Sequence, residues 1–132
     1  MLKTQARISC HHHGKIKEIN LPGGNGIRVD TAIYNGYTIP AYYDSMIAKI
    51  ITYGSSRNEA ISKMKRALEE TVIDGIDTNI DFLLEIIKNP NFIRGNFDTS
   101  FIEKEMLKGE KNKWLLIKSK KEKIKILTKK LI

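Results

Sequence analysis

The spacing of apolar residues changes along the chain, from a period of two in the first half to a helical period in the second. Ile27–Tyr34 alternates apolar and polar side chains like a half-buried strand, which places Arg28 and Asp30 together on the face away from the core. Met46–Tyr53 is an aliphatic run whose length fits a buried strand, although its period alone does not separate strand from helix. In Ala60–Val72 the apolar residues recur every three or four positions, as on one buried helix stripe. Strands followed by helices predict an α+β fold.

A turn signal divides the first strand region. Pro22–Gly26 contains one proline and three glycines in five residues, and glycine tolerates the positive φ angles that tight turns require. Lys15–Leu21, before the turn, is rich enough in β-branched residues to form a strand, so we expect it to pair with Ile27–Tyr34 as a hairpin. The expected architecture is an antiparallel β-sheet from the N-terminal half, packed with two or three helices from the C-terminal half.

A capping box marks the start of the first helix. The Ser56 hydroxyl can accept the amide of Glu59, while the Glu59 carboxylate reaches back to the Ser56 amide. We expect this helix to run to about Val72, with charged residues on its solvent side. These residues are Arg57, Lys63, Lys65, Arg66 and Glu69.

Two shorter helices should follow. Thr78–Asp81 repeats the capping-box pattern, and Pro90 prevents continuation of the helix that it starts. A third helix is expected to begin at Asp98 or Thr99 and to extend to Met106.

The positive charge is concentrated at one end of the chain. The sequence has 132 residues with Lys+Arg 23 against Asp+Glu 15, a net charge of +8. Residues 1–108 hold 14 Lys+Arg and 13 Asp+Glu, whereas residues 109–132 hold nine Lys and two Glu. The Lys-rich tail, residues 108–132, has one aromatic residue and no Arg, so it lacks the side chains that usually read bases. We favour a solvated appendage, and the alternative is a small basic nucleic-acid-binding protein that acts through this tail.

Several classes of protein are excluded by what the sequence lacks. Cys10 is the only cysteine, so neither an intramolecular disulfide nor a Cys-based zinc site can form, which fits a reducing cytosol. No segment approaches the roughly 20 apolar residues needed to span a bilayer. Met1–Ser9 lacks the apolar block of a secretion signal. A cytoplasmic protein without a membrane segment is expected.

Few residues suggest a ligand site. His11–His13 are adjacent, so their side chains cannot all face one ion without a loop, and we favour a disordered or added stretch over a metal site. Gly23–Gly26 resembles a phosphate loop only loosely, because no Lys-Ser/Thr pair follows it. We therefore predict no metal ligand and interpret these glycines as turn residues.

Arg28 is the strongest candidate for chemistry. A fixed guanidinium just after a glycine turn could bind a carboxylate, bicarbonate or phosphate in a bidentate manner. The alternative from the residues alone is a surface arginine paired with Asp30 or Glu18.

Seven segments, in unbroken order, resemble one known family, the C-terminal domain of biotin carboxylase. The resemblance covers about Gly14 to Leu107. The segments are Pro22–Asp30, Tyr34–Pro40, Tyr43–Lys49, Arg57–Leu68, Ile73–Asn79, Asn91–Phe92 and Phe97–Lys104.

The resemblance implies part of an ATP-dependent ligase. Members of this family use MgATP and bicarbonate to form carboxyphosphate, and then carboxylate biotin held on a carrier protein. The simplest such enzyme is the biotin carboxylase subunit of acetyl-CoA carboxylase, in fatty acid biosynthesis. Arg28 matches a family arginine of the biotin and bicarbonate pocket, so it is the expected catalytic and cofactor-binding residue.

The resemblance also sets domain boundaries and partners. We expect an unmatched segment at residues 1–13, the biotin carboxylase C-terminal domain at residues 14–107, and the tail at residues 108–132. The family's ATP-grasp region is not in this sequence, so MgATP and bicarbonate are cofactors only of a complete enzyme. The chain alone should be inactive, and whether it is itself an enzyme stays open.

Its expected partners are the ATP-grasp portion, biotin carboxyl carrier protein and a carboxyltransferase. A homodimer through a region that includes Ile50–Arg57 is also implied. An apolar patch should be exposed where the ATP-grasp portion packs. The sequence does not indicate which molecule finally accepts the carboxyl group.

Overall fold

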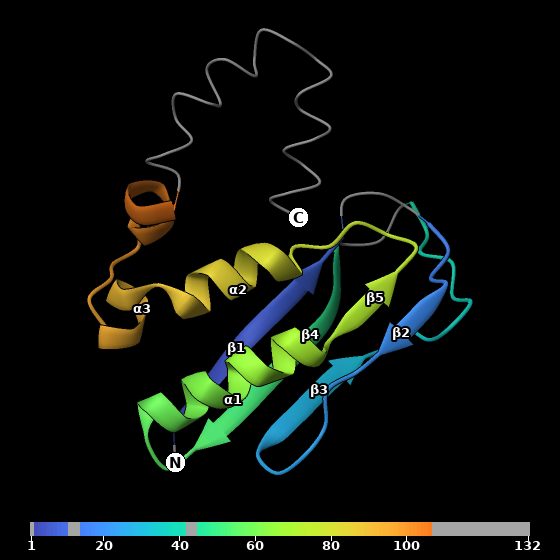
Figure 1. Cartoon of the computed structure of the whole chain (residues 1–132). Helices are drawn as coiled ribbons and strands as arrows, with labels where there is room; N and C mark the ends of the chain where they lie inside the picture. The colour runs from blue at the N-terminus through green and yellow to red at the C-terminus, as the bar shows by residue number, and fades with distance from the viewer. Residues whose placement is uncertain (1, 11–13, 42–44, 107–132) are drawn as a thin grey trace, which may run out of the picture.

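The described residues form two small antiparallel sheets, and helices cover one side of the larger sheet (Figure 1). The computed structural model describes residues 2–10, 14–41 and 45–106. In chain order, the elements are β1 (Leu2–Ser9), β2 (Glu18–Asn20), β3 (Ile27–Thr31), β4 (Met46–Gly54), α1 (Arg57–Glu70), β5 (Val72–Asp74), α2 (Ile80–Lys88), α3 (Pro90–Arg94) and the short π-helix η1 (Ile102–Met106).

The main sheet has three antiparallel strands in the order β1-β4-β3, so the longest strand is central. Helices α1 and α2 lie on the same side of this sheet (Figure 1), because α1 contacts all three strands and Ile87 of α2 belongs to the same core. The predicted α+β architecture is therefore confirmed.

Two apolar clusters hold these layers together. The larger lies between α1, α2 and the main sheet, and it includes the fully buried side chains of Ile8, Ile50, Met64 and Leu68. The smaller lies beside the second sheet, formed by β2 and β5, and includes Cys10 as a buried free thiol. Burial raises the pKa of the Cys10 thiol, so this cysteine acts as a small apolar group in the core.

The expected hairpin between Lys15–Leu21 and Ile27–Tyr34 is wrong. The first of these segments forms β2, which pairs with β5, and the second forms β3, which pairs with β4. Alternation specifies which face of a strand is buried but not which strand lies beside it. Here Ile19 lies opposite Ile73, so the partner of β2 comes from a segment about 50 residues further along the chain.

The helix starts follow the predicted caps only in part. Ser56 caps α1 and accepts a hydrogen bond from the Glu59 amide at 3.2 Å. However, the Glu59 carboxylate accepts its hydrogen bond from the amide of Ser55 at 2.7 Å rather than from that of Ser56. The second expected capping box is wrong: at the start of α2, Asn79 makes no side-chain cap and instead bonds β1, through the amide of Ser9 at 2.9 Å. That tertiary contact replaces the local one.

Arg57 is only partly exposed, although its helical position predicts a side chain that faces solvent. Its guanidinium lies 5.2 Å from the ring centre of Phe92 and 5.5 Å from that of Phe97, and its Nη2 donates to the Phe92 carbonyl at 2.6 Å. The aromatic rings attract the cation because their faces carry negative potential. Arg57 therefore joins the start of α1 to α3.

Two elements of the structure were not expected from the sequence, namely α3 and β1. Helix α3 was not expected; it begins at Pro90, with Asn89 as its N-cap. β1 is an edge strand of the main sheet, although the sequence pattern predicted no element before Lys15. The third expected helix corresponds to Phe101 and η1, preceded by a turn in which the Asp98 carboxylate accepts from the Ser100 amide. His11–His13 and residues 107–132 lie outside the described residues.

Candidate functional site

The main sheet has one face turned away from the helices, which we name the open face. Because side chains alternate along a strand, those that point away from the core on β1, β3 and β4 must share this face. At the described positions, the open face consists of Lys3, Gln5, Arg7, Arg28, Asp30, Lys49, Ile51 and Tyr53.

Arg28 is held on the open face by Asp30. The Arg28 Nε donates to Asp30 Oδ1 at 2.8 Å, and its Nη2 donates to Oδ2 at 3.2 Å. The Arg28 side chain is 62% exposed and that of Asp30 is 36% exposed, so the pair lies at the surface. The residues alone left Asp30 or Glu18 as partners of a surface arginine, and the structure selects Asp30.

The charges around this pair shift its titration. Hydrogen bonding from Arg28 lowers the pKa of Asp30, and the charges of Arg28 and Lys49 act in the same direction. The same hydrogen bond raises the pKa of Arg28. Both groups are therefore fully ionised at neutral pH.

Positive charge exceeds negative charge on the open face. The antiparallel register places Lys49 beside Asp30 on one side and beside Arg7 on the other. The described positions of this face hold four cations and one carboxylate. The cations are Lys3, Arg7, Arg28 and Lys49, and the carboxylate is that of Asp30. The proximity of Arg7 and Lys49 to Arg28 could not be predicted from the sequence, because only the strand order shows that they are neighbours. This face can attract a carboxylate, bicarbonate or phosphate group.

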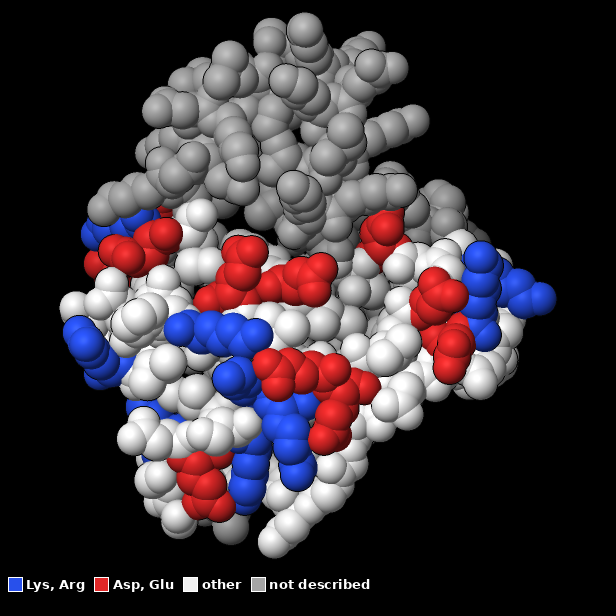
Figure 2. All heavy atoms as spheres, in the orientation of Figure 1, with Lys and Arg blue, Asp and Glu red and all other residues white. Residues whose placement is uncertain are grey.

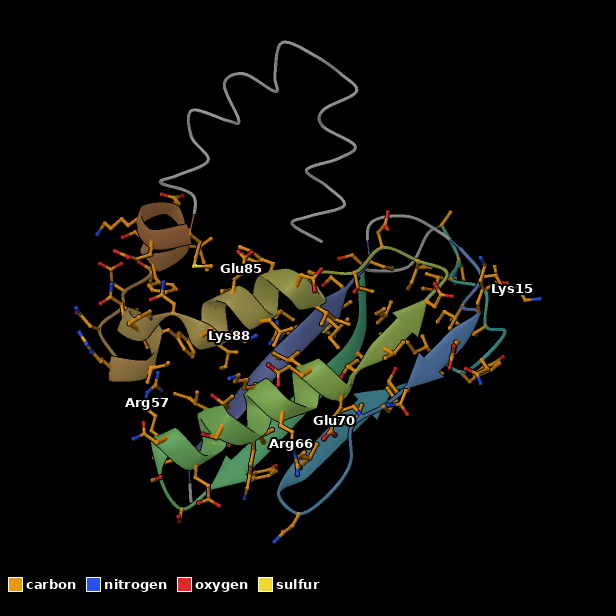
Figure 3. The ribbon with its side chains drawn as sticks, viewed as in Figure 1. Lys15, Arg57, Arg66, Glu70, Glu85 and Lys88 are labelled. Carbon is orange, nitrogen blue, oxygen red and sulfur yellow. The ribbon has the colours of Figure 1, made fainter. Side chains whose placement is uncertain are left out.

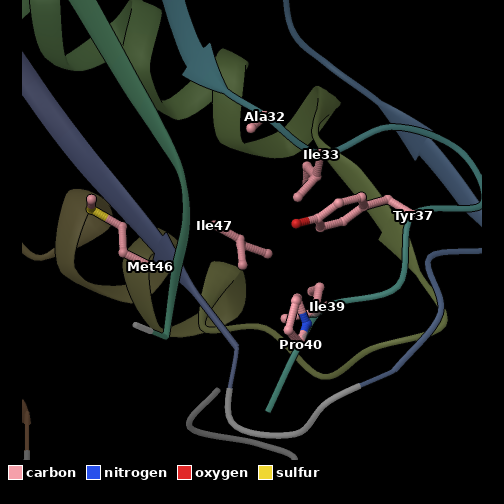
Figure 4. A pocket seen from close by; sticks show the side chains of 7 residues that line it. All are labelled: Ala32, Ile33, Tyr37, Ile39, Pro40, Met46 and Ile47. Atoms are coloured by element: carbon pink, nitrogen blue, oxygen red, sulfur yellow. The ribbon is translucent and has the colours of Figure 1, made fainter. Parts of the chain in front are cut away.

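An apolar hollow of about 370 Å³ lies at the end of β3 and the start of β4 (Figure 4). Its walls include Ala32, two residues after Asp30, and Ile47, two residues before Lys49. In Figure 4 the ring of Tyr37 points its hydroxyl toward Ile33 and Ile47. The hollow therefore lies beyond one end of β3, the strand that carries the charged pair.

The helical side of the molecule carries mixed charge. Figure 2 shows blue and red side chains interspersed over this side. Lys88 pairs with Glu69 at 3.2 Å and Arg66 with Glu70 at 3.6 Å, and Figure 3 shows Arg66 and Glu70 on α1 with Lys88 on α2. This mixture does not favour nucleic acid binding, which needs an excess of positive charge.

The described residues contain no group of His, Cys, Asp and Glu side chains that could hold a metal ion. In the same part of the chain, no helix is long and apolar enough to cross a membrane. The glycines at positions 24 and 26 have φ angles of +115° and +78°, so they form a tight turn, as predicted for Gly23–Gly26.

Comparison with known proteins identifies what this arrangement is similar to. The family model described as "Biotin carboxylase C-terminal domain" matches residues 5–104. Biotin carboxylase 1 of Bacillus subtilis (strain 168) is 58% identical over 90 residues, which cover 68% of this chain and 20% of that protein. The biotin carboxylase of Haemophilus influenzae is 48% identical over 93 residues, which cover 70% of this chain and 21% of that protein.

The structural comparison agrees. The biotin carboxylase domain dimer of Hydrogenobacter thermophilus 2-oxoglutarate carboxylase, solved in complex with MgADP, ADP and bicarbonate, superimposes with a TM-score of 0.76 and 35% identity. The match covers 80% of this chain and 25% of that chain. The chain thus spans about a fifth of the length of these sequence relatives and a quarter of the solved domain.

Proposed function

Because the chain belongs to the family of biotin carboxylase C-terminal domains, we propose that it is the part of a biotin carboxylase that carries Arg28 into the biotin and bicarbonate site. The activity of such an enzyme is the ATP- and bicarbonate-dependent carboxylation of biotin on a carrier protein, as in the first half-reaction of acetyl-CoA carboxylase. Biotin, when bound, supplies the ureido nitrogen that takes up the carboxyl group.

The observation that carries this proposal is the fixed, exposed guanidinium on the open face. Its pair with Asp30 uses two of the five N–H donors of Arg28, so donors remain for an anionic oxygen. A cation already held in place stabilises negative charge as it develops on a reacting oxygen, because little reorganisation is needed during the reaction. In this role Arg28 is both a catalytic and a cofactor-binding residue.

The nucleotide chemistry belongs to the rest of such an enzyme. The described residues offer no cluster for Mg²⁺, and the match spans only 20% of the Bacillus subtilis relative. We propose that an ATP-grasp portion packs over the open face and the hollow beside Ile47 and Tyr37. The chain alone should then neither cleave ATP with bicarbonate nor carboxylate biotin.

Further partners follow from the same proposal. A biotin carboxyl carrier protein would deliver biotin to the cytoplasmic enzyme, and a carboxyltransferase would use the product. A homodimer would use the segment from Ile50 to Arg57, in which Ile50, Ile51 and Thr52 are buried within this chain. The exposed residues Ser55 and Ser56 are therefore the side chains of that segment best placed for contact.

A fusion enzyme tests this proposal. The full 132-residue chain is joined behind the part of Bacillus subtilis biotin carboxylase 1 that it does not match, and incorporation of labelled bicarbonate into free biotin is measured with MgATP. We expect carboxybiotin from the fusion and none from the chain alone. A fusion that melts cooperatively and binds ATP but forms no carboxybiotin would refute the proposal.

A further inference from the structure

We propose that Asp30 is a positioning residue, which fixes the guanidinium of Arg28 on the open face in the orientation that the carboxylation reaction requires. This inference rests on the proposed function of Arg28. It assigns a role to a second residue, one that need not contact biotin or bicarbonate itself.

The geometry of the pair restricts Arg28 strongly. Two parallel hydrogen bonds, Nε to Oδ1 at 2.8 Å and Nη2 to Oδ2 at 3.2 Å, define both the position and the plane of the guanidinium. Residues two apart on a strand point to the same face, so the pair lies along β3, and Tyr53 of β4 adds a weaker interaction with Arg28. The Nη1 side of the guanidinium takes no part in the pair and can serve a ligand.

The strand register leaves no other carboxylate for this role. The cross-strand neighbour of Arg28 is Ile51, which is apolar, and the residue beyond it on β1 is Gln5. Asp30 is the only carboxylate at the described positions of the open face, and its own cross-strand neighbour is Lys49. Lys49 favours the ionised form of Asp30, so the pair keeps its full charge.

Without Asp30, Arg28 would lose its strongest restraint and keep only the weaker interaction with Tyr53. A side chain that is 62% exposed and has several rotatable bonds samples many rotamers unless it is held. The positive charge of Lys49 would then repel that of Arg28, because no carboxylate would lie between the two side chains. A catalytic donor stabilises charge effectively only when it is already in place, and misplacement by about 1 Å can cost on the order of a hundredfold in rate.

A double-mutant cycle in the fusion enzyme tests this role. Asp30→Asn keeps the shape of the side chain but removes its charge, and we expect the kcat for carboxybiotin formation to fall between about tenfold and a hundredfold, with little change in the KM for ATP. Asp30→Glu should recover part of the rate. In the Arg28→Met background, Asp30→Asn should cause no further loss, because it acts only through Arg28.

The matched control is Glu70→Gln, which breaks a second exposed Arg–carboxylate pair, with Arg66 on α1. Its kcat should equal that of the unmodified fusion. An Asp30→Asn variant as active as this control would overturn the inference, and so would an equal loss in the presence and absence of the Arg28 side chain.

A second readout separates this inference from the proposed function. In the isotope-labelled full chain, the NMR signal of the Arg28 Nε–H group should shift in Asp30→Asn and stay in place in Glu70→Gln. The shift supports the pairing even if the unmodified fusion is inactive, a result that would count against the proposed function alone. An unchanged signal in Asp30→Asn would overturn the positioning role.

Discussion

Replacing Arg57 by methionine should destabilise the chain far more than its charged character suggests. Arg57 begins α1, and its guanidinium lies over the rings of Phe92 and Phe97 while its Nη2 donates to the Phe92 carbonyl. Methionine keeps much of the aliphatic stem but neither the charge nor the donor. The perturbation therefore removes the polar link between α1 and α3 with little change in volume.

The magnitude follows from these contacts. A hydrogen bond from a charged donor contributes about 1.5–3 kcal/mol, and each cation–π contact about 0.5–1 kcal/mol. The Nε of Arg57 is buried without a partner among the described residues, so its removal returns about 1 kcal/mol. The net loss is about 1.5–4 kcal/mol, which lowers the Tm of a chain of this size by about 5–15 °C.

Thermal unfolding followed by circular dichroism measures this change. The control is Arg66→Met on the same helix, where an exposed arginine pairs with Glu70 and a loss below about 0.5 kcal/mol is expected. Equal Tm values for the Arg57→Met and Arg66→Met variants would refute the proposed link to Phe92.

Other perturbations have equally definite outcomes. Met64 is 1% exposed, so Met64→Ala should cost about 2–5 kcal/mol in chemical denaturation, and a loss below about 1 kcal/mol would contradict its core position. Gly75→Ala should lower the Tm more than Gly36→Ala, since both glycines have positive φ but only at position 75 would a Cβ collide with the carbonyl of Lys15; similar losses would contradict this packing. Hydrogen bonding from Lys63 and Ser55 lowers the pKa of Glu59 from 4.5 to about 2. This carboxylate therefore stabilises the fold at neutral pH, and the contribution disappears between about pH 5 and pH 2. The Tm advantage of the unmodified chain over Glu59→Gln should vanish over that range, and a constant difference would refute it.

The sequence predicted local features well and tertiary partners poorly. Alternation in Ile27–Tyr34 placed Arg28 and Asp30 on one face, and the structure confirms that they are partners. The hydroxyl of Ser56 and the apolar stripe of α1 were also predicted from neighbouring residues alone. These features depend on contacts within a few positions, which a sequence displays directly.

Most of the wrong predictions concern contacts between distant segments; the partner of the Glu59 carboxylate and helix α3 are local exceptions. β2 pairs with β5 because Ile19 and Ile73 share a core, and nothing near Ile19 indicates that partner. Asn79 bonds the end of β1 instead of capping its own helix, across 70 residues of sequence. Arg57 has the helical position of a solvent residue, but Phe92, on a helix that the sequence pattern did not predict, and Phe97 just after that helix lie against it.

The same limit applies to the candidate site. Arg28 was identified by its place after a glycine turn and by the family resemblance, whereas Arg7 and Lys49 became its neighbours only through the order β1-β4-β3. The role of Arg28 in the chemistry stays a prediction. The exposed guanidinium, which keeps N–H donors beyond its pair with Asp30, supports that proposal.

The most direct test of this account is the rate of carboxybiotin formation by the fusion enzyme with Arg28→Met, compared with Arg66→Met. We expect Arg28→Met to lower kcat on the order of a hundredfold, the usual effect of removing one preorganised donor, and Arg66→Met to leave it unchanged. Equal rates for the two variants, at equal thermal stability, would contradict the assignment of Arg28 to the reaction.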